Sequence, residues 1–85
     1  MFSFAVTDDF IKSLNKLDKS VATDVKAKLE KLAAYENPLI FAKKLQGYKD
    51  LFRFRQGDYR IVFQLQCKEI LLLLVKHRKD VYEGL

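Results

Sequence analysis

Apolar residues in the first half of the chain follow two different periods. Phe2, Phe4 and Val6 alternate with smaller or polar residues, which predicts a short strand with one buried face. Two stripes with helical spacing follow, and lysines lie outside the first of them. The first stripe consists of Phe10, Ile11, Leu14 and Leu17, and the second of Val21, Val25, Leu29 and Leu32. The pattern therefore predicts one strand followed by two amphipathic helices.

Residues with known end preferences mark both helices. Thr7 is suited to the N-cap of the first helix, and the two acids after it suit a first turn, where the helix dipole favours negative charge. Asp18 or Ser20 can cap the second helix. Asn37 precedes Pro38, and a residue before proline avoids the helical region. We expect the second helix to end there and residues 39–48 to form a connection.

From Leu51 onward the period is that of strands. Phenylalanine and arginine alternate over residues 52–55, and Gly57 with Asp58 reads as a two-residue hairpin loop, because glycine supplies the positive φ that such turns need. A further strand carries Ile61, Phe63 and Leu65 on one face. A reversal at 67–69 leads into residues 70–76, which are apolar on both faces and so indicate an interior strand.

The hairpin fixes which side chains share a face of the sheet. With Gly57 and Asp58 in the loop, paired residues have numbers that sum to 115, so Phe54 lies opposite Ile61 and Arg55 opposite Arg60. The apolar face then belongs under the two helices, and Arg53, Arg55 and Arg60 project from the other face. If the next turn is tight, at either Cys67-Lys68 or Lys68-Glu69, the odd-numbered residues of the last strand share that arginine face. These residues are Leu71, Leu73, Val75 and His77.

These elements predict an α+β fold in which a short N-terminal strand and a two-helix hairpin pack on one face of a mainly antiparallel four-stranded sheet. The 85 residues are 49% apolar and 32% charged, which suits one domain over residues 1–85 and excludes a disordered or collagen-like chain. One cysteine, Cys67, forms neither an intrachain disulfide nor a cysteine zinc cluster, and it suits a reducing cytoplasm. No membrane span or secretory signal is expected, because the longest apolar run, over 70–75, is short.

The positive charge is concentrated in the second half of the chain. Residues 1–42 carry six basic and six acidic residues, whereas residues 43–85 carry ten basic and five acidic ones, including all four arginines. This asymmetry favours a polyanionic partner, either nucleic acid or an acidic protein segment. Like charges that face each other across strands are unfavourable, so a ligand that neutralises them would explain the arrangement. Phosphate is the leading candidate, because the arginine fork binds its oxygens in pairs.

Four segments of the second half resemble the RelE family of toxins. They are Lys44-Leu45-Gln46-Gly47-Tyr48, Leu51-Phe52-Arg53-Phe54-Arg55, Gly57-Asp58-Tyr59-Arg60-Ile61-Val62-Phe63 and His77-Arg78-Lys79-Asp80-Val81-Tyr82. The order of predicted elements also resembles that of the RelE/ParE superfamily over the whole chain. The resemblance implies a toxin of a type II toxin–antitoxin system that cuts messenger RNA at the ribosome. It also implies inhibition by a cognate antitoxin, a small acidic RelB-like protein.

The resemblance also implies a set of catalytic residues. Arg53 and Arg55 match two basic strand positions of the family, and Arg60 matches the arginine of the next strand. Arg78 matches a basic residue near the end of the last strand, Tyr82 matches the C-terminal aromatic residue, and His77 resembles a histidine that precedes the arginine in many relatives. The full set is Arg53, Arg55, Arg60, Arg78, Tyr82 and His77. Three residues follow Tyr82, so we do not expect the longer C-terminal helix of some members.

RNA can be cut without a metal when its own 2′-hydroxyl attacks the adjacent phosphorus. The enzyme must then remove the 2′ proton, stabilise the phosphorane charge and protonate the 5′ oxygen. No metal or small-molecule cofactor is expected, because no Asp, Glu or His constellation has metal-ligand spacing. We expect Arg55 and Arg60 to bind the phosphate, with Arg53 as a base or second clamp. Tyr82 could stack on a base or donate a proton, and His77 titrates near neutral pH.

Other interpretations remain open for several of these residues. Tyr82 could instead pack the tail onto the sheet, and His77 could be a capping or solvated imidazole. Lys43, Lys44 and Lys49 could contact ribosomal RNA phosphates or serve solubility alone. For the whole protein, the alternatives are a DNA gyrase inhibitor of the ParE type and a noncatalytic module that binds RNA or protein.

Overall fold

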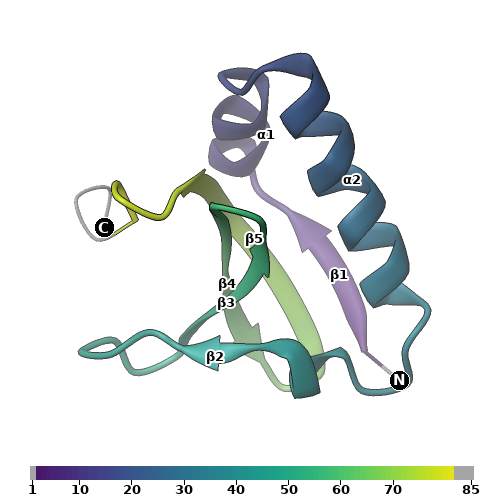
Figure 1. The fold of residues 1–85 in the computed structure, drawn as a ribbon. Coiled ribbons are helices and arrows are strands. Elements are labelled where there is room, and N and C mark those ends of the chain that lie inside the picture. The colour runs from purple at the N-terminus through teal and green to yellow at the C-terminus, as the bar shows by residue number, and fades with distance from the viewer. Residues whose placement is uncertain (1, 82–85) are drawn as a thin grey trace.

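A computed structural model describes residues 2–81 of the chain and divides them into two helices, a 3₁₀ turn and five strands (Figure 1). In chain order these are β1 (Ser3–Val6), α1 (Asp8–Asn15), α2 (Lys19–Ala33), η1 (Pro38–Phe41), β2 (Lys43–Lys44), β3 (Leu51–Gln56), β4 (Tyr59–Gln66) and β5 (Glu69–His77). The predicted α+β fold is confirmed. The sheet has one strand more than predicted, because the connection after α2 contains the 3₁₀ turn and the two-residue strand β2.

The strands form one sheet in the order β1-β5-β4-β3-β2. Strand β1 runs parallel to β5, and the other neighbours are antiparallel. Both helices lie on one side of this sheet, and the end of β5 leads into a turn on the side away from α2 (Figure 1). No helix among residues 2–81 combines the length and the apolar character needed to cross a bilayer.

The main core lies between the helices and the sheet. Phe54, Ile61 and Phe63 are fully buried there, against Phe10 of α1 and Val25 of α2. The rings of Phe54 and Phe63 stack with centroids 4.5 Å apart. The prediction that these phenylalanines lie under the helices is confirmed.

Thr7 joins the start of α1 to the sheet. As predicted, it is the N-cap, and its hydroxyl oxygen accepts a hydrogen bond from Phe10 N at 3.1 Å. The same hydroxyl donates to the Leu72 carbonyl at 2.9 Å. Asp18 occupies the N-cap position of α2 without a side-chain capping bond. The first helix is therefore fixed to β5 where β1 ends.

The hairpin between β3 and β4 has the predicted register. Phe54 is paired with Ile61 and Arg55 with Arg60, and the loop glycine, Gly57, has a φ of +60°. The next turn contains Cys67, which has a positive φ of 55°. Its two-residue loop confirms the first of the two turn positions that the sequence allows, because Gln66 is paired with Glu69.

A β-bulge in β5 overturns part of the predicted face assignment. Val62 is paired with Leu74 and Phe63 with Leu72, so Leu73 is an extra residue on the bulged strand. From there to the strand end, even-numbered residues lie on the arginine face. The placement of Val75 and His77 on that face was therefore wrong: they are paired with Ile61 and Tyr59 on the helix side.

Candidate active site

Two arginines meet at the hairpin end of the face away from the helices. Arg55 and Arg60 are directly opposite each other across β3 and β4. Arg55 Nε and Arg60 Nη1 both donate to the Gly57 carbonyl oxygen, each at 3.2 Å. One backbone oxygen therefore holds two guanidinium groups side by side. Each guanidinium has five N–H donors, so most of them remain available to a ligand.

Two further arginines complete the cluster. Burial lowers the pKa of Arg60, and the nearby positive charges of three arginines lower it further, while Asp58 acts in the opposite direction. Those three, in order of decreasing effect, are Arg53, Arg55 and Arg78. Arg78 is held at the end of β5 by its backbone N–H, which donates to the Asp58 carbonyl at 2.7 Å. The register of β3 and β4 puts Arg53, Arg55 and Arg60 on one face, and Arg78 lines a hollow together with Arg53 and Arg60; we call these four residues the arginine cluster.

A small second core holds the cluster in place. Leu45, Val62 and Val81 are almost fully buried on the arginine face, with Leu74 and Tyr48 packed against them. A hollow of about 240 Å³ lies beside this core and is lined by Leu45, Arg53, Arg60, Arg78 and Val81. Val81 thus packs against apolar residues of this face, including Leu74 of β5, and Arg78 lines the same hollow as Arg53 and Arg60.

Lysines on both sides extend the positive charge of the cluster. Lys43 of β2 is paired with Arg53, and Lys76 of β5 is paired with Arg60. The sequence reasoning did not select Lys76, because it placed odd-numbered residues of β5 on this face. With the bulge in place, Arg55, Arg60 and Lys76 form a row across three strands. Like charges in such a row repel one another, and a bound anion would remove this repulsion. The row therefore has the arrangement expected of an anion site.

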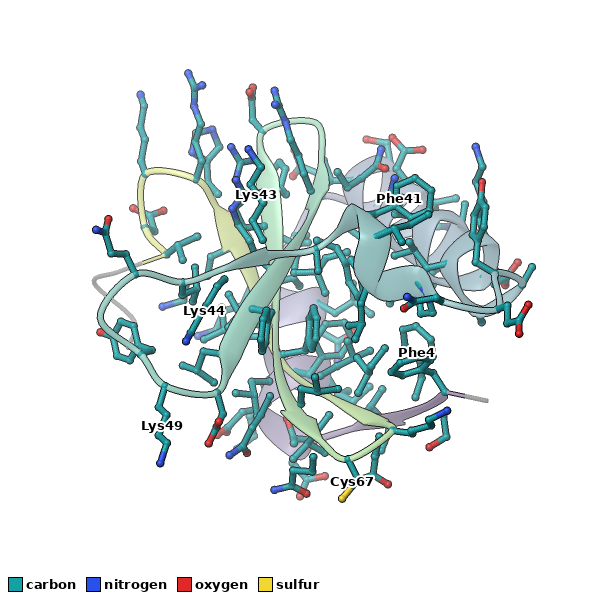
Figure 2. All side chains as sticks on the ribbon, turned by 90° about the horizontal axis from the view of Figure 1, so that it is seen from below. Phe4, Phe41, Lys43, Lys44, Lys49 and Cys67 are labelled. Carbon is teal, nitrogen blue, oxygen red and sulfur yellow. The ribbon has the colours of Figure 1, made fainter. Side chains whose placement is uncertain are left out.

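The other two predicted RNA-contacting lysines lie elsewhere. Lys44 is paired with Phe52, so it belongs to the opposite face of the edge strand. Lys49 follows the loop at Gly47 and extends away from the position of Lys43 (Figure 2). Of the three predicted lysines, the structure brings Lys43 alone to the arginine cluster.

His77 lies on the helix side of the sheet. Its ring meets that of Tyr59 edge to face, with centroids 5.4 Å apart. Its Nδ1 accepts a hydrogen bond from the Lys79 backbone N–H at 3.2 Å. The expectation that His77 joins the arginines on one face was wrong, because the bulge at Leu73 reverses the side-chain direction. Tyr82, the remaining predicted catalytic residue, lies outside the described residues.

Comparisons with known proteins agree with this fold. The family model for the ParE toxin of type II toxin–antitoxin systems, parDE, matches residues 4–82. A RelE-like toxin protein of Escherichia coli is 32% identical over 81 residues, which cover 88% of this chain and 83% of that protein. The mRNA interferase toxin RelE of Escherichia coli K12 is 30% identical over 78 residues, which cover 85% and 80%.

Solved structures give the same result. The RelB–RelE antitoxin–toxin complex of Methanococcus jannaschii contains a chain that superposes with a TM-score of 0.76 at 24% identity. The match covers 94% of this chain and 96% of that one. The helix pair, the five-stranded sheet and the sequence matches over nearly the whole length lead to one assignment. This protein belongs to the RelE/ParE superfamily of toxins from type II toxin–antitoxin systems.

Proposed function

We propose that this toxin is an mRNA interferase, a metal-independent endoribonuclease that cuts messenger RNA on the ribosome and so inhibits translation. The observation that carries the proposal is the pair of guanidinium groups held at one carbonyl oxygen, Arg55 Nε and Arg60 Nη1 at Gly57. A phosphate placed against them would replace the repulsion between like charges by attraction. The relatives named mRNA interferase RelE support the choice of RNA as the substrate.

In the proposed reaction the RNA supplies its own nucleophile. The 2′ oxygen gives its proton to a hydroxide ion of the solvent, which becomes water, and bonds to the adjacent phosphorus, while the bond from phosphorus to the 5′ oxygen breaks. The products are a 2′,3′-cyclic phosphate and a 5′-hydroxyl, whose oxygen receives a proton. Arg55 and Arg60 stabilise the charge that develops on the phosphorane oxygens, and Arg53 and Arg78 bind from the neighbouring positions.

The lowered pKa of Arg60 suits a proton donor better than a base. A guanidinium is a poor proton acceptor, because it already carries its proton at any physiological pH, and burial with nearby positive charge lowers the pKa of Arg60 and makes it a stronger acid. In the proposed mechanism the arginines stabilise the developing charge and donate a proton, and the ribosome positions the RNA. Tyr82 is proposed to stack on a base or to donate a proton.

Replacement of Arg60 by alanine tests the proposal. The cleavage of a defined messenger RNA is measured in a translation extract, and the cut ends are detected by primer extension. We expect the cleavage rate to fall by about 10²- to 10³-fold, the range seen when one oxyanion donor is removed. Lys26→Ala, which removes a positive charge from an exposed position of α2, is the matched control and should cleave normally. An Arg60→Ala protein that folds and cleaves like the wild type would contradict the catalytic role.

A second candidate function is inhibition of DNA gyrase, since the matching family model is that of the ParE toxin. Two assays, messenger RNA cleavage in the extract and DNA supercoiling by purified gyrase, separate these two candidate functions. A gyrase inhibitor leaves the messenger RNA intact and inhibits supercoiling of plasmid DNA by purified gyrase, whereas the proposed interferase cuts the message and leaves supercoiling unchanged.

We also propose that a small acidic antitoxin of the RelB type binds the toxin and blocks the arginine cluster. The structural neighbours that are RelB–RelE complexes support such a partner, and the positive arginine face supports its acidic character. Co-expression with the protein encoded beside this toxin should yield a complex that does not cleave RNA.

A further inference from the structure

A second hollow lies on the other side of β5 from the arginine cluster. It has a volume of about 700 Å³ and is bounded by α1, the end of β5 and the first residue of β4. Lys12, Lys16, Lys76, Tyr59 and His77 line it, together with the acids Asp9 and Asp80. Among the predicted catalytic residues that fall within residues 2–81, His77 is the one that lines this hollow.

The hollow exists because β1 is too short to cover the whole edge of β5. Strand β1 ends at Val6, opposite Leu72, and α1 continues along the rest of that edge. Ser13 Oγ of α1 accepts a hydrogen bond from Val75 N at 2.9 Å and donates to the Phe10 carbonyl at 2.8 Å. These bonds fix the helix to the strand at Val75. Beyond this point, at Lys76 and His77, the strand edge borders the hollow.

The imidazole of His77 has a fixed orientation in this wall. Its ring is held edge to face against Tyr59, and its Nδ1 is used as the acceptor for Lys79 N–H. The Nε2 atom is then the ring nitrogen that remains for a ligand, and it carries the proton in the neutral tautomer that this bond selects. Tyr59 and His77 together offer two rings and one N–H donor.

Basic side chains connect the hollow to the arginine cluster. Lys12 and Lys16 are four residues apart and so lie on the same face of α1. Lys76 lines the hollow and is paired with Arg60. The three lysines outnumber the two acids, Asp9 and Asp80, and Lys76 borders both sites. A polyanion bound at the arginine cluster would therefore find a second basic site next to it.

We propose that this hollow binds the nucleotide next to the one whose phosphate binds in the arginine cluster. Lysines that bind the backbone and rings that contact a base are the combination by which proteins hold single-stranded RNA. A hollow of about 700 Å³ has the size of a small-ligand site, which suits a single nucleotide. His77 acts here as a binding residue for the flanking nucleotide. This inference rests on the proposed function, because it requires an RNA at the arginine cluster.

The test compares the binding of two oligonucleotides by fluorescence anisotropy. Both are 2′-O-methyl oligouridylates, which lack the nucleophile and stay intact: a dinucleotide that fills the arginine cluster alone and an octanucleotide that reaches both sites. Lys12→Ala combined with Lys16→Ala should weaken octanucleotide binding about tenfold and lower the slope of log K against log salt by about 1.4, the value for two phosphate contacts on a single strand. Dinucleotide binding should stay within about twofold of the wild type.

The matched control removes two lysines from exposed positions of α2 that do not line the hollow, Lys26→Ala with Lys31→Ala. It should leave both affinities within about twofold of the wild type. His77→Ala should weaken the octanucleotide alone, and His77→Gln, which keeps an N–H donor, should restore part of the loss. Equal weakening by both lysine pairs, or no weakening by the first, would overturn the inference.

Two other outcomes are also decisive. If the first lysine pair leaves RNA binding unchanged and abolishes binding of a fluorescent hexaglutamate peptide, the hollow belongs to an acidic protein partner and the inference is wrong. If the wild type binds neither oligonucleotide, the inference is wrong, whereas the proposed function is decided separately by cleavage of messenger RNA in the translation extract. Arg60→Ala separates these cases, because it should weaken both oligonucleotides whenever the arginine cluster binds RNA.

Discussion

The two faces of the sheet use the same strands for opposite purposes. On the helix side, Phe54, Ile61 and Phe63 are fully buried and form the centre of the main core. On the other side, Arg55 and Arg60 of the same two strands lie directly opposite each other, and their positive charges repel. The helix side therefore supplies the stability that lets the other side hold an unfavourable cluster of charges.

Truncation of Phe54 should produce the largest change, and it should act on one face alone. The ring is fully buried and stacks on Phe63 at 4.5 Å, so Phe54→Ala should lower the free energy of unfolding by about 3 to 5 kcal/mol. Urea unfolding followed by circular dichroism measures the loss. Arg55→Ala, at the next position of the same strand, is the control and should change stability by less than about 1 kcal/mol. Similar losses of stability for both variants would contradict the conclusion that the helix side alone supplies most of the stability.

Truncation of Val81 should affect both stability and function. This side chain is 2% exposed and packs with Leu45 and Val62, and the turn that it anchors brings Arg78 to the cluster. Val81→Ala should cost about 2 kcal/mol of stability and should also reduce RNA cleavage by the folded protein, because Arg78 loses its fixed position.

The matched control for Val81 is Val25 of α2, which is also a buried valine but belongs to the main core on the helix side. Val25→Ala should cost a similar amount of stability, and cleavage per folded molecule should stay at the wild-type level. If both variants lose cleavage equally at a temperature where both are folded, Val81 has only a structural role.

Strict alternation made the β3–β4 hairpin predictable from sequence. Phenylalanine and arginine alternate there, and the Gly57-Asp58 turn fixes the register, so the pairing of Arg55 with Arg60 followed from the positions alone. The cluster of Arg53, Arg55 and Arg60 could therefore be placed before any coordinates. The position of Arg78 relative to them depends on the turn after β5, which follows no repeating pattern.

The β5 strand could not be predicted in the same way, because its sequence contains no alternation. Residues 71–75 are all apolar, and either face accepts them, so nothing in the sequence fixes which side chain points where. The bulge at Leu73 decides the question through backbone geometry, moves His77 to the helix side and brings Lys76 beside Arg60. Similarly, the two-residue strand β2 is too short to show any period.

The smallest predicted effect tests whether the charges of the arginine face oppose folding. Arg55 lies directly opposite Arg60, and such a pair of like charges costs a few tenths of a kcal/mol up to about 1 kcal/mol. Arg55→Gln should therefore raise the free energy of unfolding by about 0.5 kcal/mol at low ionic strength, although it removes the exposed hydrogen bond to Gly57. At 1 M salt the Debye length is about 3 Å, so the repulsion between exposed charges is screened and the gain in stability should vanish. Lys26→Gln on α2 controls for the loss of net charge alone. A loss of stability at both salt concentrations would mean that the bond to Gly57 outweighs the repulsion, and that the arginine face contributes to folding in its own right.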